Sequence, residues 1–182
     1  MNGTMMKRYI ITCSMIWISV MCFCITLNVA TDGSGDFSNI QAALDAAQPG
    51  DSVLVYPGRY YENLIINTND ISLISLEAVT DSSVYIESTV IDGSLMNPCL
   101  RVSQRSTNVS IRGFSFTNGL SIGSGGGLLF SSGSSTSLTN SKVFGNIANT
   151  GGGINVIGAT VAFSGVEIFD NYSKLLGGGL LA

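Results

Sequence analysis

The chain has 182 residues, of which 45% are hydrophobic and only 11% charged, and its formal net charge is −4. This length suits one domain, and the low charge excludes a coiled coil and a charged disordered tail. The chain has no histidine, which excludes Ser-His-Asp and Cys-His catalysis and every metal site that needs an imidazole ligand. The negative net charge argues against a nucleic-acid partner.

Residues 1–27 have the pattern of an export signal. Lys7 and Arg8 are followed over 9–27 by a mostly apolar stretch without a charged residue. A basic start, an apolar stretch and then polar sequence are typical of a signal peptide. A helix over 9–27 would span about 28 Å, close to the thickness of a bilayer core, so an N-terminal membrane anchor is the alternative. We predict an exported protein, extracellular, at the cell surface or associated with an outer membrane, that contacts a membrane only through this segment.

Residues 28–50 are predicted to cap the N-terminal end of a β-domain. Ser38 and Gln41, three residues apart, form the pattern of a capping box at the start of a helix. Pro49 and Gly50 end the helix. Such a helix covers the apolar side chains and unpaired backbone groups that the first strands would leave exposed. Its apolar face consists of Ile40, Ala43, Leu44 and Ala47.

From residue 51 onward the chain consists of short apolar or β-branched runs separated by Gly, Ser and Asn. Such runs are typical of strands and turns, and none is long enough for a pair of helices. We predict strands over 52–56, 64–66, 71–76, 89–91, 100–102, 109–116, 128–130, 137–144, 154–157 and 161–169.

Two motifs alternate in the second half of the chain. A Gly-Gly-Gly triplet followed by an aliphatic residue begins at Gly125, Gly151 and Gly177, which are 26 residues apart, and a Phe-x-Asn motif precedes each triplet. A repeat of this length with two or three short strands is typical of one turn of a parallel β-helix, in which each coil buries its inward side chains on the next. The predicted fold is therefore all-β: a β-solenoid domain over 28–182, with about five coils over 51–182.

The last repeat is incomplete. The sequence ends at Leu180-Leu181-Ala182, where the two preceding repeats continue for a full coil. We therefore expect a truncated chain whose last coil is open, and self-association through that coil. The side chains left partly uncovered would be those of Val161, Phe163, Val166, Ile168 and Phe169.

Two segments near the start of the predicted solenoid resemble a known family. Residues 29–44 (Val-Ala-Thr-Asp-Gly-Ser-Gly-Asp-Phe-Ser-Asn-Ile-Gln-Ala-Ala-Leu) and 57–63 (Pro-Gly-Arg-Tyr-Tyr-Glu-Asn) are similar to the first segments of pectinesterases and of many bacterial secreted β-helix proteins. The glycine-rich repeats from Ile111 onward are similar to those of bacterial secreted and surface β-helix proteins. The chain thus resembles the pectin-lyase-like superfamily. This resemblance implies a right-handed, single-stranded parallel β-helix with a short N-terminal capping α-helix.

The resemblance does not extend to a reaction. A pectinesterase would carry a Gln-Asp pair, an Asp-Phe-x-x-Gly segment and an Arg-Pro-Trp segment. None of these occurs in the chain, whose one tryptophan is Trp17 in the apolar stretch. The similarity therefore implies an architecture and leaves the activity open, because unrelated functions share this kind of fold.

Asp92 is the candidate catalytic residue, in the sequence Ile91-Asp92-Gly93, which also occurs in polysaccharide-cleaving β-helix enzymes. Arg101 or Arg112 on a nearby coil would be its basic partner. Because Asp-Gly is most often part of a turn, we predict a structural role for Asp92, and catalysis is the alternative.

Asp32, Ser34 and Asp36 space their oxygens like the start of a calcium loop. An EF-hand would need Gly and Glu where the chain has Phe37 and Ala43. We therefore predict a glycine turn that leads into the helix and places Asp36 near the positive end of the helix. The sequence predicts no cofactor, and calcium at Asp32 and Asp36 is the alternative.

Three asparagines and three phenylalanines recur once per coil. We predict that the asparagines form an internal ladder, in which each amide bonds the backbone of its own and the neighbouring coil, and that the phenylalanines stack in the core. A ligand-binding row is the alternative for the asparagines. The residues are Asn118, Asn146 and Asn171, and Phe116, Phe144 and Phe169.

These features predict an exported extracellular or cell-surface β-helix repeat protein that binds polysaccharides or cell-surface glycans and is not an enzyme. The alternative is a polysaccharide-active enzyme of the pectate or pectin lyase, pectinesterase or glycoside hydrolase type, with a degenerate or missing catalytic part. Acids and a basic residue stacked on coils beyond Ala182 would favour the enzyme. Further Gly triplets there would favour the binding protein.

Overall fold

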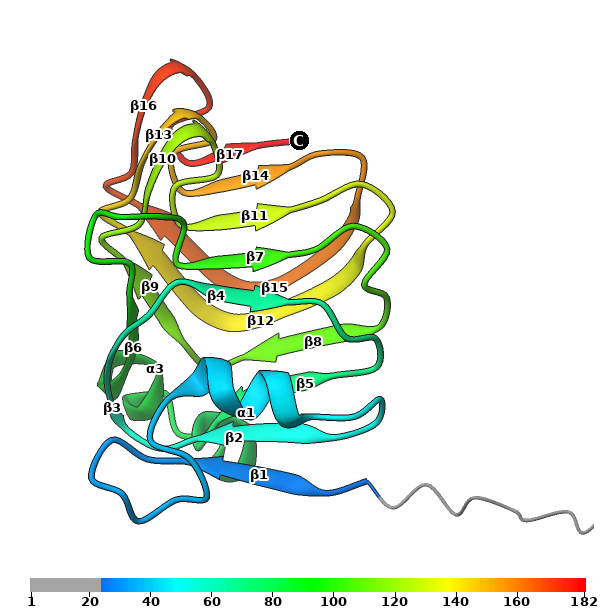
Figure 1. Ribbon diagram of the computed structural model, residues 1–182. Helices are drawn as coiled ribbons and strands as arrows, with labels where there is room; N and C mark the ends of the chain where they lie inside the picture. The colour runs from blue at the N-terminus through cyan, green and yellow to red at the C-terminus, as the bar shows by residue number, and fades with distance from the viewer. Residues whose placement is uncertain (1–23) are drawn as a thin grey trace, which may run out of the picture.

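Three β-sheets run along the molecule and enclose one apolar core (Figure 1). The computed structural model describes residues 24–182, so most of the predicted export signal lies outside the described residues. The pairings between the strands are parallel. The described chain is therefore all-β with mostly parallel strands, which agrees with a parallel β-solenoid.

The largest sheet bends at a corner into two parts, which we call its first face and its second face. The corner lies at Gly113, Asn140 and Gly165, all of which have positive φ angles. Glycine adopts this left-handed conformation freely and asparagine tolerates it. The first face consists of β1 (Thr26–Val29), β2 (Ser52–Val55), β5 (Ser72–Ser75), β8 (Val109–Arg112) and the first halves of β12 (Ser135–Phe144) and β15 (Thr160–Phe169). The second face consists of β3 (Gly58–Tyr61), β6 (Thr89–Asp92), β9 (Ser115–Thr117) and the second halves of β12 and β15.

The other two sheets complete each coil. The second sheet stacks β4 (Leu64–Ile66), β7 (Leu100–Val102), β11 (Leu128–Phe130), β14 (Ile154–Val156) and β17 (Leu180–Leu181). The third sheet stacks β10 (Leu120–Ser124), β13 (Ile147–Thr150) and β16 (Tyr172–Leu176), and it projects from the body near the C-terminus (Figure 1).

The chain passes around the core in successive coils. We number the coils by the strand that starts each one on the first face: β2, β5, β8, β12 and β15 start the first to the fifth coil. Strands at the same place in neighbouring coils pair in register, so that Leu138 lies between Ile111 and Phe163. Side chains therefore stack in rows whose spacing is that of neighbouring strands, about 4.8 Å.

The described fold begins before residue 28, the predicted start of the domain. Thr26 and Leu27 belong to β1 and pair with Ser52 and Val53 of β2. The apolar stretch over 9–27 and strand β1 therefore overlap at Thr26 and Leu27. Leu27 fits both segments, because it is apolar and packs against the core. Within residues 24–182, no helix has the length and the apolar character that crossing a membrane requires.

Helix α1 (Ile40–Ala46) covers the N-terminal end of the core, where it contacts β1, β2 and β4. Its predicted apolar face is confirmed, because Ile40, Ala43 and Leu44 are buried. Burial of these side chains against the first coil removes apolar surface from water and stabilises the closed end.

The start of α1 differs from the predicted capping box. Asn39, rather than Ser38, is the N-cap, and its side chain accepts a hydrogen bond from the Ala42 N–H at 2.9 Å. Glu62 accepts hydrogen bonds from the N–H groups of Ile40 and Gln41 at 2.8 and 2.9 Å. This carboxylate, which is distant in sequence, satisfies the free donors of the first turn and suits the positive end of the helix.

Two further helices, α2 (Glu77–Thr80) and α3 (Val84–Ser88), lie between β5 and β6. They occupy the stretch between the strands predicted over 71–76 and 89–91. Both are single turns, and α3 contacts β9 and β12 of later coils. They are therefore an insertion at the corner of the second coil.

The glycine triplets lie where the chain passes from the third sheet to the second. The first glycine of each triplet has a positive φ angle, 66° at Gly125, 59° at Gly151 and 63° at Gly177. The middle glycine lies against the next coil, since a Cβ on Gly152 would lie 2.3 Å from the carbonyl oxygen of Tyr172. The triplet therefore combines a turn that favours glycine with an approach of two backbones that excludes any side chain.

We expect Gly152→Ala to lower the free energy of unfolding by about 1–3 kcal/mol, because its methyl group must displace the backbone of the next coil. Gly123→Ala is the matched control, since the nearest atom to a Cβ there is 3.9 Å away. Urea denaturation followed by circular dichroism measures both. Equal stability of the two variants would contradict this account of the triplet.

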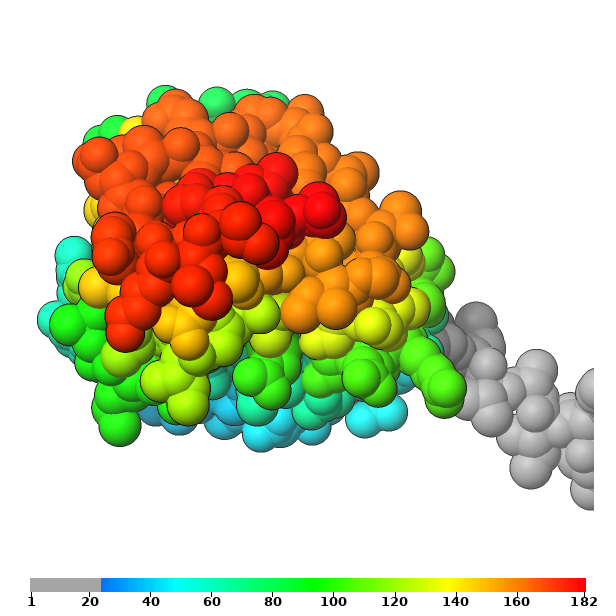
Figure 2. Space-filling model, turned by 90° about the horizontal axis from the view of Figure 1, so that it is seen from above, coloured from blue at the N-terminus to red at the C-terminus, as the bar shows by residue number. Residues whose placement is uncertain are grey.

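The fifth coil has no neighbour on one side within the described chain. Figure 2 shows its residues forming the surface at this end, and β15, β16 and β17 are the last strands of their stacks. Phe163 and Leu180 continue the inward rows of buried Leu138 and Ile154, yet they are 39% and 41% exposed. Apolar side chains and strand edges are thus exposed together.

We expect the chain without residues 1–23 to self-associate through this coil. An apolar side chain that is left fully exposed lacks the roughly 1.5–3 kcal/mol of stabilisation that its burial would contribute. Sedimentation or light scattering over a concentration series measures the association. Phe163→Ser with Leu180→Ser should weaken it, whereas Ile122→Ser, at a residue 91% exposed on the third sheet, should not. A stable monomer at high micromolar concentration would refute the expectation.

Candidate functional site

Asp92 lies at the end of β6, where the register places it between Tyr61 and Thr117. Its carboxylate accepts hydrogen bonds from the Ser94 N–H and from Asn118 Nδ2, both at 2.9 Å. Arg59 donates a charge-assisted hydrogen bond to the same carboxylate. The side chain of Asp92 is only 4% exposed. Three donors therefore bind a nearly buried carboxylate.

These donors keep Asp92 ionised. Burial alone would raise the pKa of Asp92, but the hydrogen bonds from Ser94, Asn118 and Arg59 outweigh it, so the pKa lies below the ordinary value of 3.8. A general acid needs the opposite shift, because it must carry a proton near neutral pH. The geometry therefore gives Asp92 the role of joining the turn after β6 to the coils on either side.

The two arginines predicted as partners of Asp92 lie elsewhere. Arg112 pairs with Glu77 of α2 and with Asp81, which follows that helix. Arg101 lines a cavity of about 200 Å³ beside Asn63, Ile65 and Pro98. Arg59, the residue that contacts Asp92, lies in β3 next to Tyr60, and its strand pairs with β6. Strand residues alternate between the two sides of a sheet, so Arg59 and Tyr61 of the segment 58–61 point outward. This alternation in the sequence is the pattern from which Arg59 could have been predicted as an outward basic residue.

The carboxylates of Asp32 and Asp36 bind different groups of the chain and do not share a partner. Asp32 accepts hydrogen bonds from the N–H and hydroxyl of Ser34 at 2.9 and 2.7 Å. Asp36 accepts from the N–H and amide of Asn28 at 2.8 and 3.0 Å. The hydrogen bonds from Ser34 lower the pKa of Asp32, and those from Asn28 lower the pKa of Asp36. Asp36 thus holds β1 rather than the start of α1, where Glu62 lies instead.

Metal ligands do not gather elsewhere in the described part of the chain. Among residues 24–182, no group of three or more Cys, Asp and Glu side chains has the arrangement to hold a metal ion. The calcium hypothesis stays a prediction, and Asp32 and Asp36 on their own supply too few ligands for the six to eight oxygens that calcium takes.

Two of the three recurring asparagines stack. Asn171 donates from Nδ2 to the carbonyl oxygens of Val143 and Phe169 at 2.8 and 2.9 Å, and its Oδ1 accepts from the Asn146 N–H and amide. Asn146 is fully buried and accepts from the Gly119 N–H at 2.8 Å. These amides bond the backbone of their own and the neighbouring coil, and thereby satisfy groups that the sharp turn leaves unpaired.

Asn118 lies one residue out of this stack and bonds Asp92 instead. Phe116 pairs with Val143 rather than with Phe144, so the motif is displaced by one position between the third and fourth coils. Asn118 consequently has a positive φ angle, 55°, like Gly145 at 65° and Asp170 at 51°. The predicted ladder of three asparagines is therefore wrong for Asn118.

The same displacement corrects the predicted phenylalanine stack. Phe116 is buried and contacts Phe114 with ring centroids 5.9 Å apart. Phe144 and Phe169 stack on each other with ring centroids 5.0 Å apart and ring planes nearly parallel, but they lie in the row of Thr117, and Phe169 is 40% exposed. They point outward because strand residues alternate between the faces of a sheet.

Cys99 is buried beside the stacked asparagines, next to Asn146. Its thiol lies 3.1 Å from the carbonyl oxygen of Thr117 and 3.4 Å from Asn146 Oδ1. Burial raises the pKa of Cys99 to about 12. A thiol in this state is a structural group, because the reactive form is the thiolate.

The first face of the largest sheet carries a row of small hydroxylated side chains on its outer surface. Strand register aligns one residue from each strand: Thr26, Ser52, Ser72, Ser110 and Ser137, with Ala162 next in line. We call these five hydroxyl-bearing residues the hydroxyl row. Its serines are partly exposed, and their hydroxyls form no hydrogen bond to another group of the described chain. They are free to donate to a ligand or to water.

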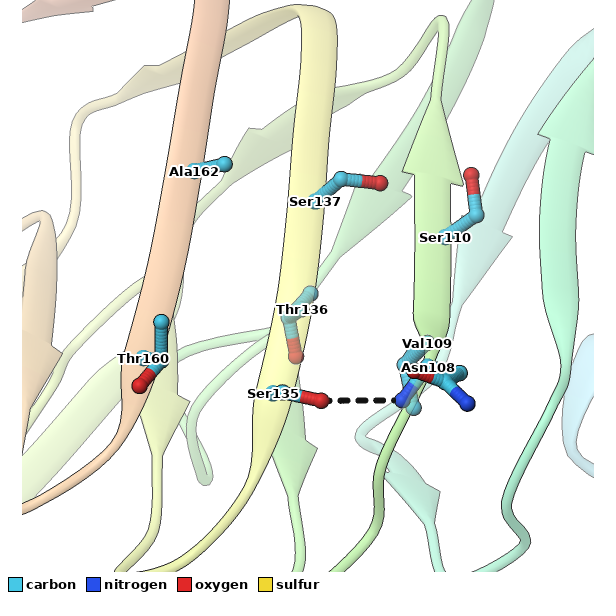
Figure 3. Close-up of a pocket in the computed structure, with 8 residues that line it drawn as sticks. All are labelled: Asn108, Val109, Ser110, Ser135, Thr136, Ser137, Thr160 and Ala162. Atoms are coloured by element: carbon cyan, nitrogen blue, oxygen red, sulfur yellow. Dashed lines mark hydrogen bonds between the residues drawn. The ribbon is translucent and has the colours of Figure 1, made fainter.

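A shallow groove of about 300 Å³ lies along the C-terminal part of the hydroxyl row (Figure 3). Ser110 and Ser137 line it on neighbouring strands, with Ala162 on the next, and the Ser135 hydroxyl accepts a hydrogen bond from the Asn108 N–H at 3.0 Å. The remaining lining residues, Val109, Thr136 and Thr160, are also uncharged. The groove thus offers hydroxyls on a strand surface that carries no charge.

Comparison with protein-family models gives no match for this chain, and comparison with curated proteins finds no similar sequence.

Asp92→Asn tests the structural role of Asp92. We expect a loss of about 1–3 kcal/mol in unfolding free energy at pH 7, because a buried, charge-assisted hydrogen-bond network is broken. Since the pKa of Asp92 is lowered in the fold, its contribution is present above the ordinary value of 3.8 and is lost as the pH falls through the lower folded value. The difference between wild type and variant should therefore shrink in acid.

Urea denaturation at pH 7 and near pH 3 measures this difference. Asp170→Asn is the control, because Asp170 is exposed and asparagine also tolerates its positive φ angle. A stability difference for Asp92→Asn that stays the same at both pH values would contradict the ionised network.

Proposed function

We propose that this protein is an exported, right-handed parallel β-helix of the pectin-lyase-like superfamily that binds glycans of polysaccharides or cell surfaces without cleaving them. The parallel stacking of three sheets supports the architecture, together with the pectinesterase-like segments at 29–44 and 57–63. The basic and apolar segment 1–27 supports export. The hydroxyl row is the observation that carries the binding function.

The hydroxyl row suits an extended, hydroxyl-rich polymer. Its hydroxyls follow one another across the strands at about 4.8 Å, so a chain lying along the solenoid would meet a donor or acceptor at each of the first four coils. A hydroxyl both donates and accepts, which matches the hydroxyls of a sugar better than a fixed charge does. The uncharged lining of the groove beside Ser110 and Ser137 favours neutral over anionic glycans.

The state of the acidic side chains supports binding rather than cleavage. Asp92 is held as a carboxylate by Arg59 and two further donors, and Glu77 is engaged by Arg112. Glycoside cleavage by a pair of acids needs one of them protonated and the other free to attack or to activate water. The proposal therefore assigns no catalytic residue.

Glycan-array binding of the fluorescently labelled protein tests the proposal, followed by titration of the best glycans. We expect the triple variant Ser72→Ala, Ser110→Ala and Ser137→Ala to bind about 10-fold or more weakly, since each neutral hydrogen bond contributes about 0.5–1.5 kcal/mol. The loss of hydroxyls should leave the fold intact, because these groups bond nothing within the described chain.

The control is the triple variant Ser38→Ala, Ser82→Ala and Ser83→Ala, which removes three hydroxyls that lie away from the row and form no hydrogen bond within the described chain. We expect its affinity to equal that of the wild type. An array without any bound glycan would refute the binding function. Cleavage of a bound polysaccharide, detected as new reducing ends or unsaturated products, would replace it with the enzymatic alternative.

A further inference from the structure

The corner of the largest sheet is expanded in one coil. In the third, fourth and fifth coils the two faces meet within one or two residues, at the positive φ angle of Gly113, Asn140 or Gly165. In the second coil the same corner extends over residues 76–88 and contains α2 and α3. Helix α3 contacts β9 and β12, so the expanded corner folds over the outside of later coils instead of projecting into solvent.

Glu77 in α2 fixes the expanded corner to the third coil. Its side chain is 4% exposed, and its carboxylate accepts hydrogen bonds from Arg112 Nε and Nη2 at 2.8 and 3.2 Å. Gly113 makes room for it, since a Cβ there would lie 2.8 Å from the Glu77 Cβ. The Ile86 carbonyl oxygen also accepts a hydrogen bond from Ser115 Oγ at 2.8 Å. A buried carboxylate needs such partners, so these contacts are mutually dependent.

The same corner also reaches the fourth coil. Asn140 Nδ2 donates to Glu77 Oε1 at 2.8 Å, and Lys142 Nζ donates to Glu87 Oε1 at 2.8 Å. Lys142 also lies 3.8 Å from Glu167 of the fifth coil. Residues of the second coil are therefore in direct contact with the fourth coil, across the third.

This contact departs from the usual energetics of a solenoid. In repeat architectures each unit contacts only its neighbours, so stability is a sum of unit and nearest-neighbour terms and the ends unfold separately from the middle. A contact that skips one unit adds a term that is lost unless all three units are folded. Contacts within one network are coupled and do not add.

We propose that residues 76–88 act as a brace that joins the second, third and fourth coils into one cooperative unit, with Glu77 as its central group. The exposed pairs contribute little, because Asp81 and Glu87 are 86% and 70% exposed at the side chain. The brace therefore depends on the buried contacts of Glu77 with Arg112 and Asn140.

Native-state hydrogen exchange of the full chain, read by mass spectrometry, tests the brace. In the wild type we expect amides of β5, β8 and β12 to share one opening equilibrium under mild denaturant. In Glu77→Gln we expect exchange of β12 to rise at least about tenfold relative to β5, the loss that one charged hydrogen bond predicts. Asp81→Asn is the matched control on the same insertion, and we expect the ratio to stay unchanged.

Asn140→Gly tests the brace from the fourth coil, because glycine accepts the positive φ angle of 45° and only the amide is lost. It should reproduce the effect of Glu77→Gln, and the double variant should exchange no faster than the single variants. Two outcomes would show that the insertion acts only on its own coil and would overturn the proposal. In one, the rise in β12 exchange in the double variant equals the product of the rises in the two single variants. In the other, exchange rises equally in β5 and β12.

Discussion

The stacking of each coil's backbone on the next is the constraint on which the rest of the structure depends. Backbone hydrogen bonds parallel to the axis of the solenoid hold neighbouring coils together. Examples are the bonds from Leu128 N–H to the Gly153 oxygen and from Ile154 N–H to the Gly179 oxygen. Where the chain turns between sheets, this spacing leaves no room for a Cβ, and only glycine fits. Where the turn leaves backbone groups unpaired, a buried amide such as that of Asn146 bonds them. The coil spacing thus determines both which residues are tolerated at the turns and which are needed there.

The sequence predicted the features that follow from repetition. The triplets at Gly125 and Gly151 mark neighbouring coils because equal positions must accept equal neighbours. The displaced motif at Phe116 could not be placed in the same way, since its distance to Phe144 is one residue longer than the register of β9 on β12 requires. The third sheet and helices α2 and α3 were not predicted either. Segments such as β10 alternate too weakly to be read as strands and become strands by pairing with β13, while α3 depends on tertiary contacts with β9 and β12.

The candidate site was less predictable than the fold. The serines of the hydroxyl row are separated by 20, 38 and 27 residues from Ser52 to Ser137, so they show no period in the sequence. They form a row because the differences in coil length, such as the insertion at 76–88 and the shorter first coil, lie outside the strands of the first face. These strands therefore stay in register. Asp92 was identified as a residue of interest, but its partner Arg59 is 33 residues earlier and is recognised only from the pairing of β3 with β6.

The insertion at the corner of the second coil also affects how such a protein can change in evolution. Coils whose contacts end at their nearest neighbours can be duplicated or lost one at a time, and each event lengthens or shortens the molecule by one strand spacing. Between Glu77 and Lys142 this freedom is restricted, because an added coil would separate partners that now meet across a single intervening coil. Variation in length is therefore expected among homologues beyond the fourth coil, where the triplets at Gly151 and Gly177 bound interchangeable units, while the segment from β5 to β12 is inherited as a block.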